Sequence, residues 1–82
     1  MINDEIKASL FAARDLEYRD FHAKLIPDIC KERIIGVRTP MLRKMAKSFS
    51  KESDIEQFLN ALPHEYYDEY NLHGFIIAEM PD

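Results

Sequence analysis

Apolar residues recur at intervals of three and four along most of this 82-residue chain, and this spacing constrains the fold more than any other feature. It is the spacing of one face of an α-helix, whereas a half-buried strand would show strict alternation. The stretches VRT and YNLHGFII are respectively too short and too irregular to be strands. We therefore expect an all-α protein built from antiparallel helical pairs with short connectors.

The pattern predicts five helices, and local signals place their ends. Asp15 and Ser53 are suitable N-caps for the second and fourth helices, and Glu56 has the spacing of a capping box with Ser53. Thr39 is expected to cap the third helix, with Pro40 at the first helical position, where a missing N–H costs nothing. The helices are expected over residues 3–14, 16–26, 40–49, 53–62 and 64–80.

The chain has the length of one small domain, residues 1–82, and its last helix is unusual. The segment NLHGFIIAEM is apolar around much of its circumference, which predicts burial on more than one side. In a solenoid of helical pairs the next pair would cover it, as would happen if the sequence were a piece of a longer protein. In a separate domain, we expect a homodimer through this helix. The apolar residues in need of a partner would be Leu72, Phe75, Ile76, Ile77 and Met80.

Basic residues are concentrated in the middle of the chain, although the formal net charge is −4. Residues 14–47 contain nine basic and five acidic side chains, a net charge of +4, whereas residues 48–82 contain one basic and eight acidic ones, a net charge of −7. From Arg33 to Lys51 there are six basic residues and no acidic one. The overall charge therefore says little about partners, and the local field of this segment says more.

The third helix would present these cations on one side. Arg43, Lys44 and Lys47 fall opposite its apolar stripe, and Arg38 lies in the loop before it. Two interpretations are open: a solvated surface, or a phosphate-binding surface, since the free N–H groups of a helix N-terminus also attract anions. Phosphate binding would be independent of sequence and sensitive to salt. The apolar stripe consists of Leu42, Met45, Ala46 and Phe49.

The remaining candidates for a site are weak. His22, His64 and His73 are scattered, and the chain has neither a metal-binding motif nor a glycine-rich phosphate loop, so we expect no metal and no cofactor. The acids at positions 65, 68 and 69 are expected on the solvated start of the fifth helix. The aromatic cluster near them is expected in the core, with a pocket that stacks a base as the alternative. This cluster consists of Tyr66, Tyr67, Tyr70 and Phe75.

Two features of the sequence suggest in which cellular compartment the protein lies. Cys30 is the single cysteine and cannot form an internal disulfide, which favours a reducing environment. The N-terminal segment MINDEIKASL carries acids that a signal peptide lacks, and no apolar run approaches the roughly 18 residues of a membrane helix. We therefore expect a cytoplasmic protein.

Three segments, in their order and spacing, resemble the opening of DNA alkylation repair proteins of the AlkD-like group. They are DLEYRDFHAKLIPDI, IIGVRTPMLRKMAK and FLNALPHEYYDEYNLHGFII, and the resemblance covers about residues 15–80. The most specific part is the pairing of GVRTPxLRxxAK with LPHEYYxExNLHxFxI at this separation. The resemblance implies a curved superhelix of HEAT-like helical pairs whose basic concave face holds duplex DNA.

The family's activity is hydrolysis of the N-glycosidic bond of alkylated purines, such as 3-methyladenine and 7-methylguanine, without a metal or nucleotide cofactor. Its members are longer, and the Asp and Trp side chains that serve catalysis lie beyond the part that this chain resembles. The present chain has no Trp, and none of its acids matches that motif. We therefore assign no catalytic residue and expect the chain to be inactive as a glycosylase on its own.

The resemblance implies DNA contacts in the N-terminal basic surface. The candidate DNA-binding residues are Arg38, Arg43, Lys44 and Lys47. An aromatic residue of the second helix, Tyr18 or Phe21, could reach toward a lesion, although a core position is favoured for Phe21. The alternative is a non-catalytic helical module for protein interaction or dimerisation.

Overall fold

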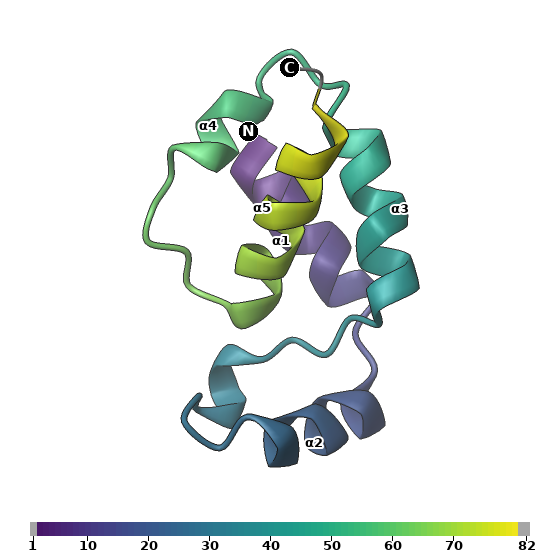
Figure 1. Cartoon of the computed structure of the whole chain (residues 1–82), viewed down its shortest axis with the longest axis vertical. Coiled ribbons are helices and arrows are strands. Elements are labelled where there is room, and N and C mark those ends of the chain that lie inside the picture. The colour runs from purple at the N-terminus through teal and green to yellow at the C-terminus, as the bar shows by residue number, and fades with distance from the viewer. Residues whose placement is uncertain (1, 81–82) are drawn as a thin grey trace.

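The computed structural model describes residues 2–80, and it confirms the all-α prediction, since no strand occurs within this range. Five α-helices and one short 3-10 helix follow one another along the described chain (Figure 1). Their bounds are α1 Ile2–Ala12, α2 Leu16–Leu25, η1 Lys31–Arg33, α3 Thr39–Phe49, α4 Ile55–Leu59 and α5 Tyr67–Glu79.

The start of α2 agrees with the sequence signals, α1 begins one residue earlier than expected, and the other three helices differ in their cap or first residue. Asp15 caps α2 as predicted, because its side chain accepts a hydrogen bond of 3.1 Å from the N–H of Tyr18. Thr39 lies inside α3, and the cap position is Arg38, whose side chain makes no capping bond. The last two helices are shorter than predicted. α4 has Asp54 at its cap position in place of Ser53 and spans 5 residues, and α5 begins three residues after position 64.

Four helices enclose the hydrophobic core. α3 packs along α5, and α1 packs against α4. α1 supplies three fully buried side chains at intervals of four residues, the spacing of a single helix face. The buried core consists of Ile2, Ile6, Leu10, Ile35, Val37, Leu42, Ala46, Ile55, Phe58, Leu72 and Ile76.

α2 lies apart from this core, at the bottom of the view in Figure 1. None of its residues is buried, and Phe21 and Leu25 are 60% and 63% exposed. The core position favoured for Phe21 was therefore wrong. Only part of the apolar stripe of α2 is covered: the His22 ring lies 5.3 Å from the Tyr67 ring of α5, whereas Phe21 and Leu25 face solvent. A hydrogen bond of 2.8 Å from the N–H of Asp15 to the carbonyl of Gly36 ties the start of α2 to the connector before α3.

The connector over residues 34–37 is buried, and the carboxylate of Asp68 on α5 holds it in place. This carboxylate accepts backbone hydrogen bonds from Ile35 at 2.7 Å, Gly36 at 3.3 Å and Val37 at 2.9 Å. Gly36 has φ +94°, a conformation that residues with a Cβ rarely adopt. A buried loop needs partners for its N–H groups, and here one carboxylate serves three of them.

This contact overturns one expectation about the acids of the fifth helix. Asp68 and Glu69 are 3% and 6% exposed, so they are buried and do not lie on a solvated helix start. Glu69 accepts a hydrogen bond of 3.0 Å from the N–H of Tyr66, just before the helix. Glu65, by contrast, is exposed and forms an ion pair of 3.2 Å with Lys7.

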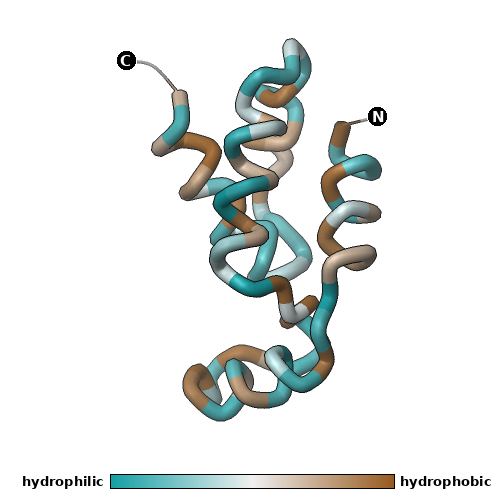
Figure 2. The backbone as a smooth tube through the Cα atoms, turned by 90° about the vertical axis from the view of Figure 1, so that its right-hand side faces the viewer, coloured by the Kyte–Doolittle hydropathy of each residue, from teal (hydrophilic) through white to brown (hydrophobic). Residues whose placement is uncertain are grey.

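The apolar residues at the end of the chain were all expected to need a partner, but they differ in burial. Leu72 and Ile76 are fully buried in the chain's own core and need no further partner. Phe75 and Met80 are partly buried against that core, whereas Ile77 is 53% exposed. Figure 2 shows the apolar stretch in the C-terminal half of this helix.

Candidate nucleic-acid interface

The cations of α3 occupy the side of the helix that the sequence predicted. Arg43, Lys44 and Lys47 are exposed, while Leu42 and Ala46 are buried on the opposite side. Among residues 2–80, none of these three cations has a carboxylate oxygen within 4.0 Å. Their charges are therefore available to an external anion.

Arg38 differs from the three cations of α3 because it is already partly neutralised. Its Nη2 lies 3.1 Å from Oδ2 of Asp15, and its guanidinium lies 5.0 Å from the centre of the Tyr18 ring. The pKa of Asp15 is lowered, first by the hydrogen bond from the Tyr18 N–H and then by Arg38. Arg38 remains exposed, so it is a fixed cation with spare donors.

Beside Arg38, the surface has a hollow of about 300 Å³ lined by aromatic groups. Tyr18 and Phe21 of α2 form its apolar walls, and Glu17 completes it. Of the two rings, Phe21 is exposed and Tyr18 is half-buried, and aromatic rings at a surface next to arginine suit the stacking of a nucleobase or a sugar. The sequence had offered both aromatic residues as candidates, and the structure places both at the surface hollow beside a predicted DNA contact.

The side chain of Arg43 extends toward α5. Its guanidinium lies 5.4 Å from the centre of the Phe75 ring, and both residues line a hollow of about 280 Å³ together with Glu79. The acids of the first turn of α5 do not compete for this cation, because Asp68 and Glu69 bond to backbone N–H groups elsewhere. Lys44 and Lys47 are thus the least encumbered of the predicted contacts.

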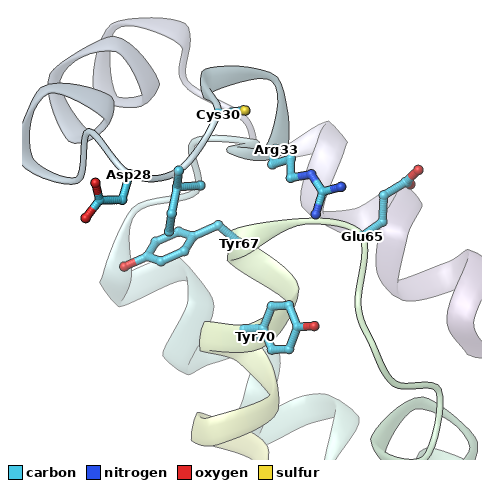
Figure 3. Close-up of a pocket in the computed structure, with 7 residues that line it drawn as sticks. Asp28, Cys30, Arg33, Glu65, Tyr67 and Tyr70 are labelled. Carbon is cyan, nitrogen blue, oxygen red and sulfur yellow. The ribbon is translucent and has the colours of Figure 1, made fainter.

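The predicted tyrosine cluster is divided between the core and a surface pocket. Tyr66 packs against the core and meets Phe11 edge-on at 5.2 Å. Tyr67 and Tyr70 instead line a pocket of about 400 Å³ (Figure 3), and Tyr70 is 46% exposed. The pocket also contains Asp28, Ile29, Cys30, Arg33 and Glu65. Its two carboxylates make it less suited to a phosphate than the surface of α3.

Two histidines that looked scattered in the sequence lie together in the fold. Nε2 of His64 and Nδ1 of His73 are 3.0 Å apart, and the His64 ring stacks on Phe58 at 4.5 Å. Burial lowers the pKa of His64, Glu69 opposes that effect, and His73 adds to it. Within residues 2–80 no group of three or more His, Cys, Asp or Glu side chains is placed to hold a metal ion. A loop brings these two rings together, and helical periodicity does not report such a contact.

Comparison with known proteins adds no relative to this description. No family model matches the chain, and neither a curated protein nor a solved structure matches it. Within residues 2–80, no helix combines the length and the apolar character that crossing a membrane requires.

Proposed function

We propose that this chain is a DNA-binding element of the type found at the start of AlkD-like alkylation repair glycosylases, and that it does not catalyse base release by itself. The observation that carries the proposal is the exposed set of Arg43, Lys44 and Lys47 on α3, none of which has a carboxylate oxygen within 4.0 Å among residues 2–80. We propose DNA as the partner of this surface because the motif pair around residues 36–47 and 62–77 resembles that of the AlkD-like proteins.

The proposed partner is the phosphate backbone of duplex DNA. Cations on one helix face attract a polyanion without reading its bases, and binding of this kind weakens steeply as salt is added. The hollow formed by Tyr18, Phe21 and Arg38 would contact a nucleotide at the edge of that surface. The proposal includes the HEAT-like arrangement of helical pairs and a cytoplasmic location.

A charge-reversal pair tests the DNA contact. In Arg43→Glu/Lys47→Glu, we expect DNA affinity at low salt to fall at least tenfold, and the slope of log affinity against log salt to decrease by about 2. Fluorescence anisotropy with a labelled duplex measures both. The control is Lys24→Glu/Lys51→Glu, which changes the net charge equally on residues outside α3. Equal losses of affinity in the two variants would show that binding depends on the net charge of the chain, and they would contradict a specific role for the α3 cations.

A second assay tests the catalytic part of the proposal. The chain is incubated with methylated duplex DNA, and released 3-methyladenine and 7-methylguanine are measured by chromatography. We expect release no faster than from DNA alone, because the chain has no Trp and no acid that matches the family's catalytic motif. Release well above that background would refute the statement that the chain is not catalytic.

The alternative function is a protein-interaction module that keeps the helical scaffold without a DNA role. One observation favours it: the outer side of α5 exposes Tyr70 and Ile77 at 46% and 53%. If the wild-type chain failed to bind DNA at low salt, this alternative would replace the DNA-binding proposal.

A further inference from the structure

The loop over residues 60–66 joins α4 to α5, and a single buried residue anchors most of it. His64 is 5% exposed, whereas residues 60–63 and Glu65 are exposed. Tyr66, at the end of the loop, packs against the core. The ion pair of Glu65 with Lys7 is largely open to water and therefore contributes little. The position of residues 60–65 thus depends mainly on the contacts of His64.

Three contacts hold His64. Its backbone N–H donates a hydrogen bond of 2.9 Å to the hydroxyl of Tyr70, and its ring stacks on Phe58 with the ring centres 4.5 Å apart. Its Nε2 lies 3.0 Å from Nδ1 of His73. Tyr70 and His73 both belong to α5, so two of the three contacts fasten the loop to that helix. The contact between the two ring nitrogens is the one that depends on protonation.

Two imidazole nitrogens at this distance share one proton, because one of them must donate and the other must accept. A first added proton is compatible with the contact, since a charged ring can donate to a neutral one. A second added proton leaves an N–H group on both facing nitrogens and brings two cations together. The contact therefore exists while at most one ring is charged, and it is lost when both rings are charged.

The surroundings of the pair make the second proton costly. Burial has the largest effect and lowers the pKa of His64, the Glu69 carboxylate raises it, and His73 lowers it further. The other charged groups around the hollow that His64 lines are Asp4 and Lys7 of α1 and Glu65 of the loop, with Lys7 already paired to Glu65. α4 contributes the uncharged Phe58. Moving His64 into water removes both the burial and the repulsion between the rings.

We propose that the contact between His64 and His73 is a pH-sensitive latch, which holds residues 60–65 against α5 at neutral pH and releases them when both rings are charged. The buried core contains no residue of this loop segment, so the helices stay packed when the latch opens. Both histidines lie in the segment LPHEYYDEYNLHGFII, whereas the proposed DNA contacts lie on α3 and just before it. The latch therefore does not rest on the proposed DNA-binding function.

Opening the latch changes the pocket shown in Figure 3. Glu65 of the loop and Tyr70 of α5 both line that pocket. When the loop moves away, Glu65 leaves the pocket wall, and the Tyr70 hydroxyl loses the N–H group that it accepts from His64. The shape of the pocket on this side therefore depends on pH.

Hydrogen exchange of the full chain, followed by NMR at about pH 7.5 and about pH 5, is the test. Ordinary carboxylates are still charged at the lower value, while histidines in water are protonated. The released loop binds more protons than the latched loop, so acid favours release. After correction for the intrinsic rates, we expect acid to reduce the protection of the His64 N–H at least tenfold more than that of Ala46, in the core side of α3.

His73→Gln removes the second charge and keeps a polar side chain of similar size. In this variant, acid should change the protection of the His64 N–H no more than that of Ala46. The control is His22→Gln, which removes a histidine of α2 and should respond as the wild type does. Circular dichroism shows whether each variant folds, and His73→Asn preserves the test if His73→Gln does not fold.

Two results would overturn the latch. An unchanged response in His73→Gln would show that burial of His64 alone accounts for the effect of acid. Equal losses of protection at His64 and Ala46 in the wild type would show that the chain opens as a whole and that the loop is not released separately.

Discussion

α3 and α5 pack against each other but distribute their charges in opposite ways. α3 turns Leu42 and Ala46 inward and its lysines outward, as an amphipathic helix at a surface does. α5 turns two carboxylates inward, and its exposed residues between positions 70 and 78 are uncharged. The difference comes from what each charge finds nearby: a carboxylate can be buried where several N–H groups converge on it, whereas a lysine without a partner remains in water.

The largest expected loss of stability follows from removing the Asp68 carboxylate on the buried side of α5. Asp68→Ala leaves three buried N–H groups of the connector without an acceptor, so we expect a loss of about 3–5 kcal/mol in the free energy of unfolding. Urea denaturation followed by circular dichroism measures it. Asp68→Asn keeps one acceptor oxygen and should lose less. Asp28→Ala removes an exposed carboxylate and should change stability by less than about 0.5 kcal/mol, so a similar cost for Asp28 and Asp68 would contradict the burial argument.

The next largest effects come from truncating one aliphatic side chain to alanine on each of α3 and α5. Leu42→Ala creates a cavity at a side chain that is 2% exposed, and it should cost about 2–4 kcal/mol. Ile77→Ala removes a side chain that is half in water, and it should cost less than about 1 kcal/mol when measured at low protein concentration. If the two costs were alike, α5 would have no open face, and its contrast with α3 would disappear.

Smaller effects are expected at the two glycines: Gly36 in the connector that Asp68 holds, and Gly74 on the exposed side of α5. An alanine at Gly36 would place its Cβ 2.7 Å from Arg19 Cβ and from the Asp15 carbonyl oxygen, at a positive φ, so we expect a loss of about 2 kcal/mol. Gly74→Ala meets nothing within 4 Å and should stabilise the monomer by about 0.5–1 kcal/mol. Thermal melts of the two variants and the wild type show whether the two signs differ.

The smallest effect concerns pH and the buried ring next to the inner side of α5. Burial lowers the pKa of His64 in the folded chain, so between its unfolded value near 6.5 and its folded value the unfolded state binds more protons. Stability should therefore be complete above about pH 7 and decrease as the pH falls through about 6.5. Urea midpoints at about pH 7.5 and 5.5 measure this. His64→Gln should reduce the difference between them, while His22→Gln serves as the control and should retain it.

The local features of α3 were predictable because they depend on neighbours in sequence. A Thr-Pro start and an apolar stripe at Leu42 and Ala46 are sufficient to place the helix and the side on which Arg43 and Lys47 lie. The error at its start is one residue, Arg38 in place of Thr39 at the cap. The exposure of Lys44 and Lys47 follows from the same periodicity.

The errors concern contacts between residues far apart in the chain. Phe21 lies on an apolar stripe, but periodicity does not say whether another element covers that stripe. Asp68 has the position of an ordinary helix-start acid, but its partners are N–H groups 31 to 33 residues away. The approach of His64 to His73 depends on the path of the loop before α5, and no regular spacing encodes it.

The sequence by itself determined that the chain is helical, where most of its helices lie, and that one of them displays a row of cations, because these properties arise from interactions within a few residues. The tertiary structure alone decided that α2 lies outside the core, that Asp68 is buried, and that Ile77 of α5 is exposed. The physical reason is desolvation: whether a side chain is buried depends on the groups that meet it in space, and a buried carboxylate is stable only where distant N–H groups converge on it.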